Sequence, residues 1–173
     1  MIAVTTGRNP TQSTRRLCKE LASSLPQAYR LVRGKLSLPQ LTDKLAASQS
    51  SRLIIVYRGF GGPRRLELMK LEDDHLRRIP PSIILRNVRF TSTSKRRRAA
   101  RAECITANTD AATRLGEALS DFLELQLVDN EKAPCTHSLD ISRDPYGGLR
   151  LAPINLSTRN VEGFVVYVKT LRW

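Results

Sequence analysis

Two ten-residue stretches resemble each other in sequence and in context, and this repeat constrains the fold more than any other feature. Residues 16–25 read RLCKELASSL and residues 114–123 read RLGEALSDFL, so an arginine and three leucines recur at the same offsets, 98 residues apart. Each stretch follows a short apolar run and a polar turn, as in a strand that leads into a helix. Shared leucines can arise by chance in any two helices, but the shared context favours a duplicated half-domain.

The spacing of apolar residues predicts an α/β (α+β) fold of two similar halves, each with a mixed β-sheet and helices. Asn9 fits the N-cap of the first helix, with Pro10 at its first position. We expect a loop at 72–75. The strands expected in the first half are 2–6, 28–32, 53–57, 64–71 and 83–90, with helices after Asn9 and over 38–45. Those expected in the second half are strands 104–107, 137–142, 149–153 and 161–171, with a helix over 111–125.

Charge is distributed unevenly along a chain whose formal net charge is +13. Residues 1–90 hold 17 Lys and Arg against 6 Asp and Glu, whereas residues 91–173 hold 12 against 10. The basic half would therefore contact an anionic partner, and the other half would have a different role. The organisation that we expect is a single domain over 1–173, with an N-terminal half at about 1–92, a basic joint at about 93–102 and a C-terminal half at about 103–173.

Arginine makes up 22 of the 29 cationic residues. Its guanidinium group binds phosphate through paired hydrogen bonds and stacks on bases, so this bias predicts RNA as the partner. A GC-rich genome or a hot habitat is the alternative explanation for the bias. Aromatic residues are few, and Tyr29, Tyr57 and Phe60 are those near basic residues that can stack on bases. Tyr57 also fits a core strand.

Cysteine usage and hydropathy indicate an intracellular protein. The three cysteines, Cys18, Cys104 and Cys135, are odd in number and far apart, and no C-x-x-C occurs. We therefore expect no disulfide framework, no zinc site and a reducing compartment, the cytoplasm. The apolar start of the chain is too short for a signal peptide, and no apolar run approaches the ~20 residues that span a membrane.

The stretch TTGRNPTQSTRRL at 5–17 places a glycine turn between the first strand and the first helix. A nucleotide-binding loop of the Walker or Rossmann type needs further glycines at fixed spacing, and only Gly7 is present. A helix N-terminus offers free amides, so Arg8 and Arg15 can hold a backbone phosphate here. The alternative is ordinary turn and cap chemistry. We interpret the turn as a structural corner that displays both arginines to RNA.

Groups that carry catalysis are sparse in this sequence. Neither His75 nor His137 lies in a recognisable motif with a cysteine or serine. The acidic run 72–74 lacks the further spaced oxygens of a cation site, and such a run is commonly a solvated loop. We therefore expect no enzyme activity, metal, cofactor or small-molecule substrate.

The run 95–101 is the strongest electrostatic element, because four consecutive cations have no acidic run nearby to pair with them. On binding a phosphate backbone these cations would release counterions. The alternative is a basic linker that only separates the halves. The candidate RNA-binding residues are Arg8, Arg15, Arg16, Arg33, Lys35, Lys95, Arg96, Arg97, Arg98 and Arg101.

An ordered series of motifs runs through the start of the chain: Thr5-Thr6-Gly7-Arg8-Asn9-Pro10, Cys18-Lys19-Glu20-Leu21, Pro26 and Arg33-Gly34. This series resembles the N-terminal signature of the Brix-domain family of ribosome-biogenesis proteins, and the hairpin and the restart at 103–125 extend the resemblance over nearly the whole chain. The chain departs from the family at Phe60–Arg64, where a longer segment is usual, and it lacks the long basic extensions of eukaryotic members. It is similar to a minimal archaeal form, in the group that resembles the small-subunit processome member.

This resemblance implies two α/β halves, each like the anticodon-binding domain of class IIa aminoacyl-tRNA synthetases. It also implies a non-catalytic factor that binds precursor rRNA and assembly proteins and assists rRNA processing and subunit assembly. Two alternatives stay open. One is a tRNA- or synthetase-associated anticodon-binding-like module, and the other is a hydrolase or nuclease whose site the sequence does not reveal.

Overall fold

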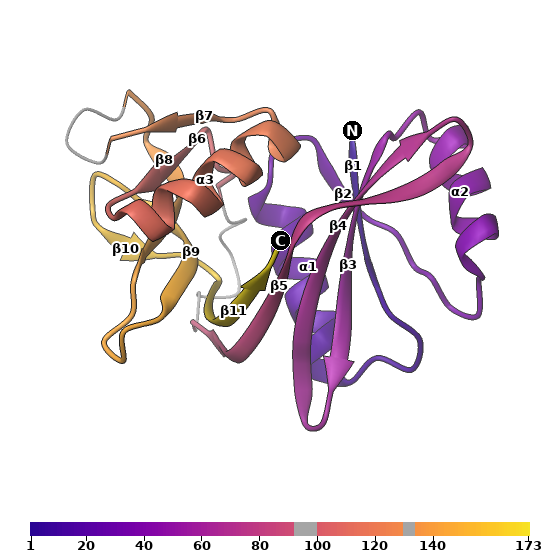
Figure 1. The fold of residues 1–173 in the computed structure, drawn as a ribbon, viewed down its shortest axis with the longest axis horizontal. Helices are drawn as coiled ribbons and strands as arrows, with labels where there is room; N and C mark the ends of the chain where they lie inside the picture. Colours follow the sequence, from indigo (N-terminus) through magenta and orange to yellow (C-terminus); the bar gives the residue numbers. More distant parts are fainter. Residues whose placement is uncertain (92–99, 130–133) are drawn as a thin grey trace.

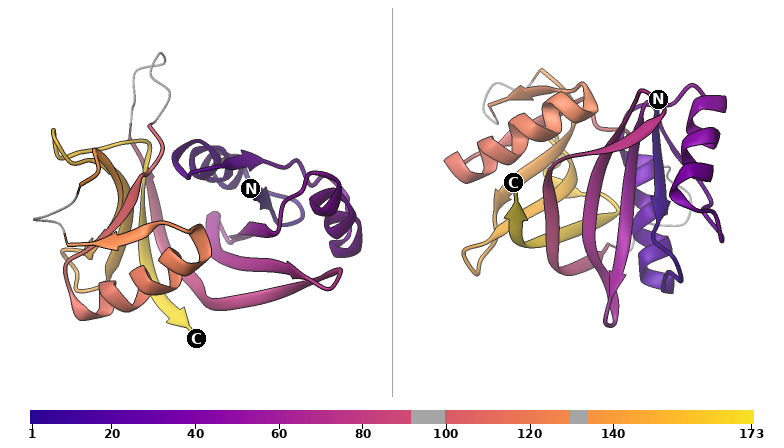
Figure 2. Two further views of the ribbon diagram at one scale, coloured as in Figure 1. Left: turned by 90° about the horizontal axis from the view of Figure 1, so that it is seen from above. Right: turned by 45° about the vertical axis from the view of Figure 1, so that its right-hand side comes forward.

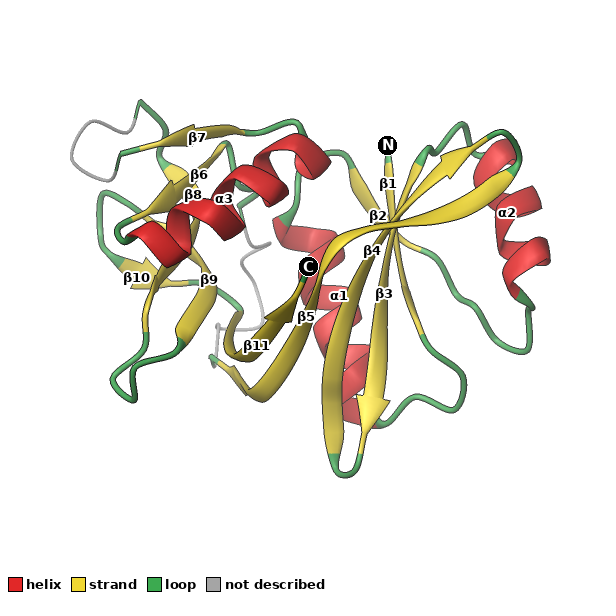
Figure 3. Cartoon of the chain, in the orientation of Figure 1, coloured by secondary structure: helices red, strands yellow, loops and turns green. Residues whose placement is uncertain are grey.

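A computed structural model describes residues 1–91, 100–129 and 134–173. Within these residues, eleven strands form one continuous mixed sheet on which three helices pack (Figure 1; Figure 3). The strand order is β2-β1-β3-β4-β5-β11-β9-β8-β6-β7, and β10 pairs with β9 beside this path. The fold is therefore the mixed α/β arrangement predicted from the sequence.

Each half contributes its own run of elements to this sheet, as the two views in Figure 2 show. The first half holds β1 (Ile2–Thr6), α1 (Gln12–Ser24), β2 (Ala28–Arg30), α2 (Leu38–Ala47), β3 (Arg52–Gly59), β4 (Gly62–Glu72) and β5 (His75–Phe90). The second half holds β6 (Cys104–Ala107), α3 (Asp110–Leu123), β7 (Gln126–Val128), β8 (His137–Arg143), β9 (Leu149–Asn155), β10 (Asn160–Val161) and β11 (Phe164–Arg172).

The strand order is the same when it is read inward from either edge of the sheet. Strand β1 lies between β2 and β3 and is parallel to both, and β6 lies in the same way between β7 and β8. The strands then continue as antiparallel pairs, β3-β4-β5 in one half and β8-β9-β11 in the other. The long strand β5 pairs with β11 and so joins the halves. The prediction of two similar halves is confirmed.

The leucines of the repeated stretches occupy equivalent places in the core. Leu21 of α1 is 3% exposed and Leu119 of α3 is 4% exposed, and both lie in one hydrophobic cluster that spans the two halves. The same holds for the buried pairs Leu17 and Leu115, and Leu25 and Leu123. Helical spacing, with Leu25 as the C-cap of α1, thus places the three leucines of each repeated stretch in the core, as the sequence predicts.

The face of the sheet opposite α1 differs between the halves. In the first half the part of this face beneath α2 is apolar and packs against Leu45. In the second half the corresponding face is polar, and Thr106 Oγ1 donates a hydrogen bond of 3.1 Å to Asp140 Oδ1. Helix α2, which begins with a Ser37–Gln40 capping box, has no counterpart among the described residues of the second half.

Three predicted boundaries are wrong, and one of them is the strand expected over 161–171, which the structure divides into β10 and β11. The N-cap of α1 is Thr11, whose hydroxyl accepts a hydrogen bond from the Thr14 amide at 3.2 Å, while Asn9 has a φ of 49° before the helix begins. Strand β5 begins at His75 instead of residue 83, because Asp73 and Asp74, both with positive φ, make a two-residue hairpin turn. The charged and proline-containing start of β5 hides its strand character in the sequence.

The expectation of no disulfide is also wrong, because a disulfide joins Cys104 and Cys135. Cys104 begins β6, which pairs in parallel with β8, and Cys135 lies just before β8. This pairing brings the two Cα atoms to 6.2 Å across a sequence separation of 31. An odd cysteine count does not exclude such a pair, and Cys18 is left as a free, buried thiol.

None of the helices in the described ranges is both long and apolar enough to cross a membrane.

Candidate nucleic-acid interface

The glycine turn after β1 is a close-packed corner. The Gly7 amide donates a hydrogen bond of 2.8 Å to the Val56 carbonyl. A Cβ atom at Gly7 would lie 2.8 Å from Cδ1 of Tyr57, so a side chain here would collide with the aromatic ring. Glycine is therefore required by packing, and the adjacent Arg8 is exposed.

An exposed cationic corner forms where α1 begins. Arg8 and Arg15 are both exposed. The tip of the β3–β4 hairpin lies beside them, since a Cβ on Gly62 would be 3.3 Å from Ser13 Oγ. Phe60 is fully exposed at that tip, and a basic residue lies near it on each strand, Arg58 and Arg64. The corner thus offers cations and one aromatic ring to a ligand.

The other predicted residues are more scattered. Arg16 lies with its Cζ 4.4 Å above the Phe90 ring. Arg33 is 7% exposed, and its Nε donates to the Leu36 carbonyl at 3.1 Å, whereas Lys35 is exposed. Lys95, Arg96, Arg97 and Arg98 lie outside the described residues.

Arg101 lies at the opposite end of α1 from Arg8. Its Nη2 donates to the Ala28 carbonyl at 3.5 Å, and the next residue, Ala102, donates its amide to Ser24 at the end of α1. The helix has 13 residues and is therefore about 20 Å long at 1.5 Å per residue. The structure thus brings Arg8 and Arg15 together and places Arg101 at a distance from them.

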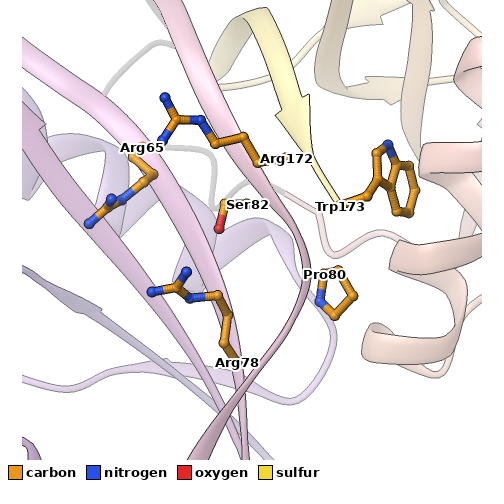
Figure 4. A pocket seen from close by; sticks show the side chains of 6 residues that line it. All are labelled: Arg65, Arg78, Pro80, Ser82, Arg172 and Trp173. Atoms are coloured by element: carbon orange, nitrogen blue, oxygen red, sulfur yellow. The ribbon is translucent and has the colours of Figure 1, made fainter.

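Sequence reasoning missed a second cationic feature, a groove across β4, β5 and β11. It consists of two adjoining hollows of about 290 and 400 Å³ that share Arg65 and Arg172. Figure 4 shows Arg65, Arg78 and Arg172 reaching over the same stretch of sheet from three strands, with Ser82 between them. We call this feature the sheet groove; its cationic lining residues are Arg58, Arg64, Arg65, Arg78, Lys169 and Arg172.

A buried carboxylate organises part of the sheet groove. Glu67 is 3% exposed, and its Oε1 lies 3.3 Å from Arg65 Nε and 3.3 Å from Arg78 Nη2. The Arg65 guanidinium carbon also lies 4.5 Å from the centre of the Tyr57 ring. Burial, with the nearby Glu67 charge as a smaller cause, raises the pKa of the Tyr57 phenol, so this ring stays neutral.

The groove was missed because its cations come from strands far apart in the sequence. Arg65 and Arg78 reach the same Glu67 carboxylate only through the β4–β5 pairing, and Arg172 joins them through the pairing of β11 with β5. The available signal was the arginine pairs 64–65 and 77–78 on consecutive strands. Alternation places one arginine of each pair on the same face of a hairpin.

Neither histidine lines the sheet groove. His75 is exposed at the start of β5, and His137 lies 3.9 Å from Glu103 and 4.0 Å from Glu162. Among the residues that the structure describes, no three His, Cys, Asp or Glu side chains are grouped to hold a metal ion.

Comparisons with known proteins find one relative in sequence and several solved structures of the same fold. No family model matches the sequence. A protein of Methanopyrus kandleri named as a probable Brix domain-containing ribosomal biogenesis protein is 32% identical over 83 residues, 48% of this chain. The matched part spans only 41% of that curated relative's length.

Two solved structures share the fold over nearly the whole chain. A probable ribosomal biogenesis protein from Aeropyrum pernix K1 superimposes with a TM-score of 0.77 at 20% identity, covering 96% of this chain and 94% of that one. Mil, an archaeal Imp4-like protein, superimposes with a TM-score of 0.71 at 17% identity, covering 98% of both chains. The resemblance to Brix-domain proteins predicted from the sequence is confirmed.

Proposed function

We propose that this chain is a non-catalytic ribosome-biogenesis factor that binds precursor rRNA and assists its processing and subunit assembly in the cytoplasm. The observation that supports the proposal is the joint likeness, in sequence to one protein and in fold to another, to proteins named for ribosomal biogenesis. The formal net charge of +13 supports RNA as the partner, since cations on a protein surface gain affinity from displaced phosphate counterions.

The two halves would divide the work. The exposed cations of the first half and of the joint, among them Arg8, Arg15, Arg16, Lys35 and Arg101, would contact the RNA backbone. The half at about 103–173 would contact an assembly protein, because it carries most of the acidic residues outside the joint. Such contacts position an RNA without reading its sequence, so we expect little sequence preference.

Charge reversals on the two halves test this division. Arg8→Glu and Arg15→Glu change exposed residues at the start of α1 and should weaken RNA binding with little change in melting temperature. The matched controls are Glu117→Lys and Asp121→Lys, which are exposed on α3 and should leave RNA affinity intact. Equal losses of affinity in both pairs, measured side by side, would contradict the division between the halves.

The basic joint is tested through salt dependence. Neutralising Lys95, Arg96, Arg97 and Arg98 together should weaken binding to structured RNA and reduce the slope of log K against log salt by up to about 3, at ~0.7–0.9 for each phosphate that the variant no longer neutralises. If this variant leaves the slope unchanged, the joint does not contact the RNA and acts only as a linker between the halves.

A further inference from the structure

The sheet groove carries more cations than the acid beside it can neutralise. Its two hollows are lined by arginine, lysine, aromatic and small polar or apolar residues, and among the described residues no Asp or Glu side chain lines either hollow. The one acid nearby is Glu67, which lies beneath the surface at 3% exposure and pairs with two arginines. One carboxylate against six cations leaves a surplus of positive charge facing the solvent.

The groove lies on the side of the sheet away from α1. Leu66 and Leu68 of β4 face the core beneath α1, so the alternating Arg65 and Glu67 face the other way. Residue Arg172 pairs with Ser82 of β5 and shares that outward face, whereas its neighbour Leu171 packs against the core. The groove therefore opens on the other face of the sheet from α1, and it meets the corner at Arg8 only at Arg58 and Arg64 of the β3–β4 hairpin.

An aromatic ring lies at each end of the groove. Tyr57 lines the hollow that holds Arg58 and Arg64, and Trp173 lines the other, beside α3 (Figure 4). Trp173 is half exposed, and Arg114 lies 4.1 Å from its ring centre. A cationic path with aromatic rings along it is the arrangement with which proteins hold single-stranded nucleic acid, because cations follow the backbone and rings stack on bases.

We propose that the sheet groove binds a single-stranded segment of RNA, with the cations on its phosphates and a base stacked on Trp173. This inference rests on the proposed function and names the surface and the form of RNA. A duplex presents its bases stacked and paired, and hollows of 290 and 400 Å³ are too small to receive a helix. An acidic protein segment is the competing occupant, and fluorescence titration distinguishes the two.

Trp173 is the only tryptophan of the sequence, so its fluorescence reports directly on the groove. Titrating the protein with a twelve-nucleotide oligouridine should quench this fluorescence as a base stacks on the indole. A twelve-base-pair RNA duplex and a polyglutamate peptide are titrated in parallel. We expect neither to quench.

Variants separate the groove from the rest of the RNA surface. Lys169→Gln with Arg172→Gln removes two exposed cations that pair with no acid among the described residues, and should lower the salt slope for oligouridine by about 1.4, at ~0.7 per phosphate for single strands. Arg143→Gln with Arg159→Gln removes two exposed cations that line neither hollow, and should leave the slope unchanged. Trp173→Ala should weaken oligouridine binding about tenfold. Melting temperatures are measured for all variants.

The outcomes distinguish this inference from the function on which it rests. If the Lys169 and Arg172 variant binds RNA as tightly as the unmodified protein, the groove is not the binding site, and the proposed function is unaffected. Quenching by polyglutamate without quenching by RNA overturns the inference in favour of a protein occupant. Failure of the unmodified protein to bind any RNA overturns both the groove and the proposed function.

Discussion

Arg52 links the two halves, and its replacement by methionine tests how the sheet is held together. The side chain starts on β3 of the first half and is 10% exposed. Its Nη1 donates to the Phe122 carbonyl in the last turn of α3 at 2.8 Å, and its Nη2 donates to Glu124 Oε2 at 2.8 Å. One arginine thus satisfies a helix terminus that lies 70 residues away in sequence.

The two bonds of Arg52 differ in expected strength. A bond from a charged donor to a buried carbonyl contributes roughly 1.5–3 kcal/mol. The ion pair contributes at most ~1 kcal/mol, because the Glu124 side chain is 72% exposed and solvent screens it. Arg52→Met keeps the apolar stem and should therefore lower the free energy of unfolding by about 2–4 kcal/mol, whereas Glu124→Gln should lower it by no more than about 1 kcal/mol.

Urea denaturation followed by circular dichroism measures both values, and the double variant gives the coupling energy between the two residues. We expect a coupling of at most about 1 kcal/mol and a single cooperative transition. A cost for Glu124→Gln equal to that of Arg52→Met would show that the ion pair dominates. A cost below about 1 kcal/mol for Arg52→Met would refute the assigned role of the Phe122 carbonyl bond.

Three further predictions concern the core and the cysteines. Leu21→Ala and Leu119→Ala should each lower the free energy of unfolding by roughly 2–5 kcal/mol in urea titrations, because both residues are buried at equivalent places; a small effect at either would contradict the equivalence. Cys135→Ser should lower the free energy of unfolding by about 3–4 kcal/mol, because it opens a loop of 31 residues. Thiol titration of the unmodified protein, unfolded without reductant, should find one free thiol instead of three. Burial raises the pKa of Cys18 from 9.0 to about 11. The stability that the neutral, buried thiol contributes is therefore fully present below pH 9 and is lost as the pH rises towards 11. At pH 8, Ellman's reagent should modify Cys18 only when the protein unfolds.

Local periodicity was enough to predict most elements of this fold. The leucines of α1 and α3 recur at helical spacing, and their strand–turn–helix context revealed the two halves before any pairing was known. The cap of α1 was misassigned because Asn9 and Thr11 are both good capping residues, and the sequence does not show that Asn9 has positive φ. Strand β7 was missed because it has only three residues and follows α3 after only two, so that the helix predicted over 111–125 runs directly up to it.

The sheet groove and the disulfide depended on information that no local pattern carries. Arg65 and Arg172 meet only because β5 pairs with both β4 and β11, and Cys135 reaches Cys104 only because β6 pairs with β8. Pairings between distant strands are set by the packing of the whole core. The corner at Arg8 was predictable because the strand, turn and helix that form it are consecutive in the chain.

Sequencing the RNA that is crosslinked to the protein in living cells tests the central claim most directly. The proposed function predicts enrichment of precursor rRNA, including sequences that are removed during processing, over mature rRNA and tRNA. Crosslinks should be reduced for a variant with Arg8→Glu and Arg15→Glu and retained for one with Glu117→Lys and Asp121→Lys. Enrichment of tRNA, or recovery of no RNA above background, would contradict the claim that this chain acts on precursor rRNA.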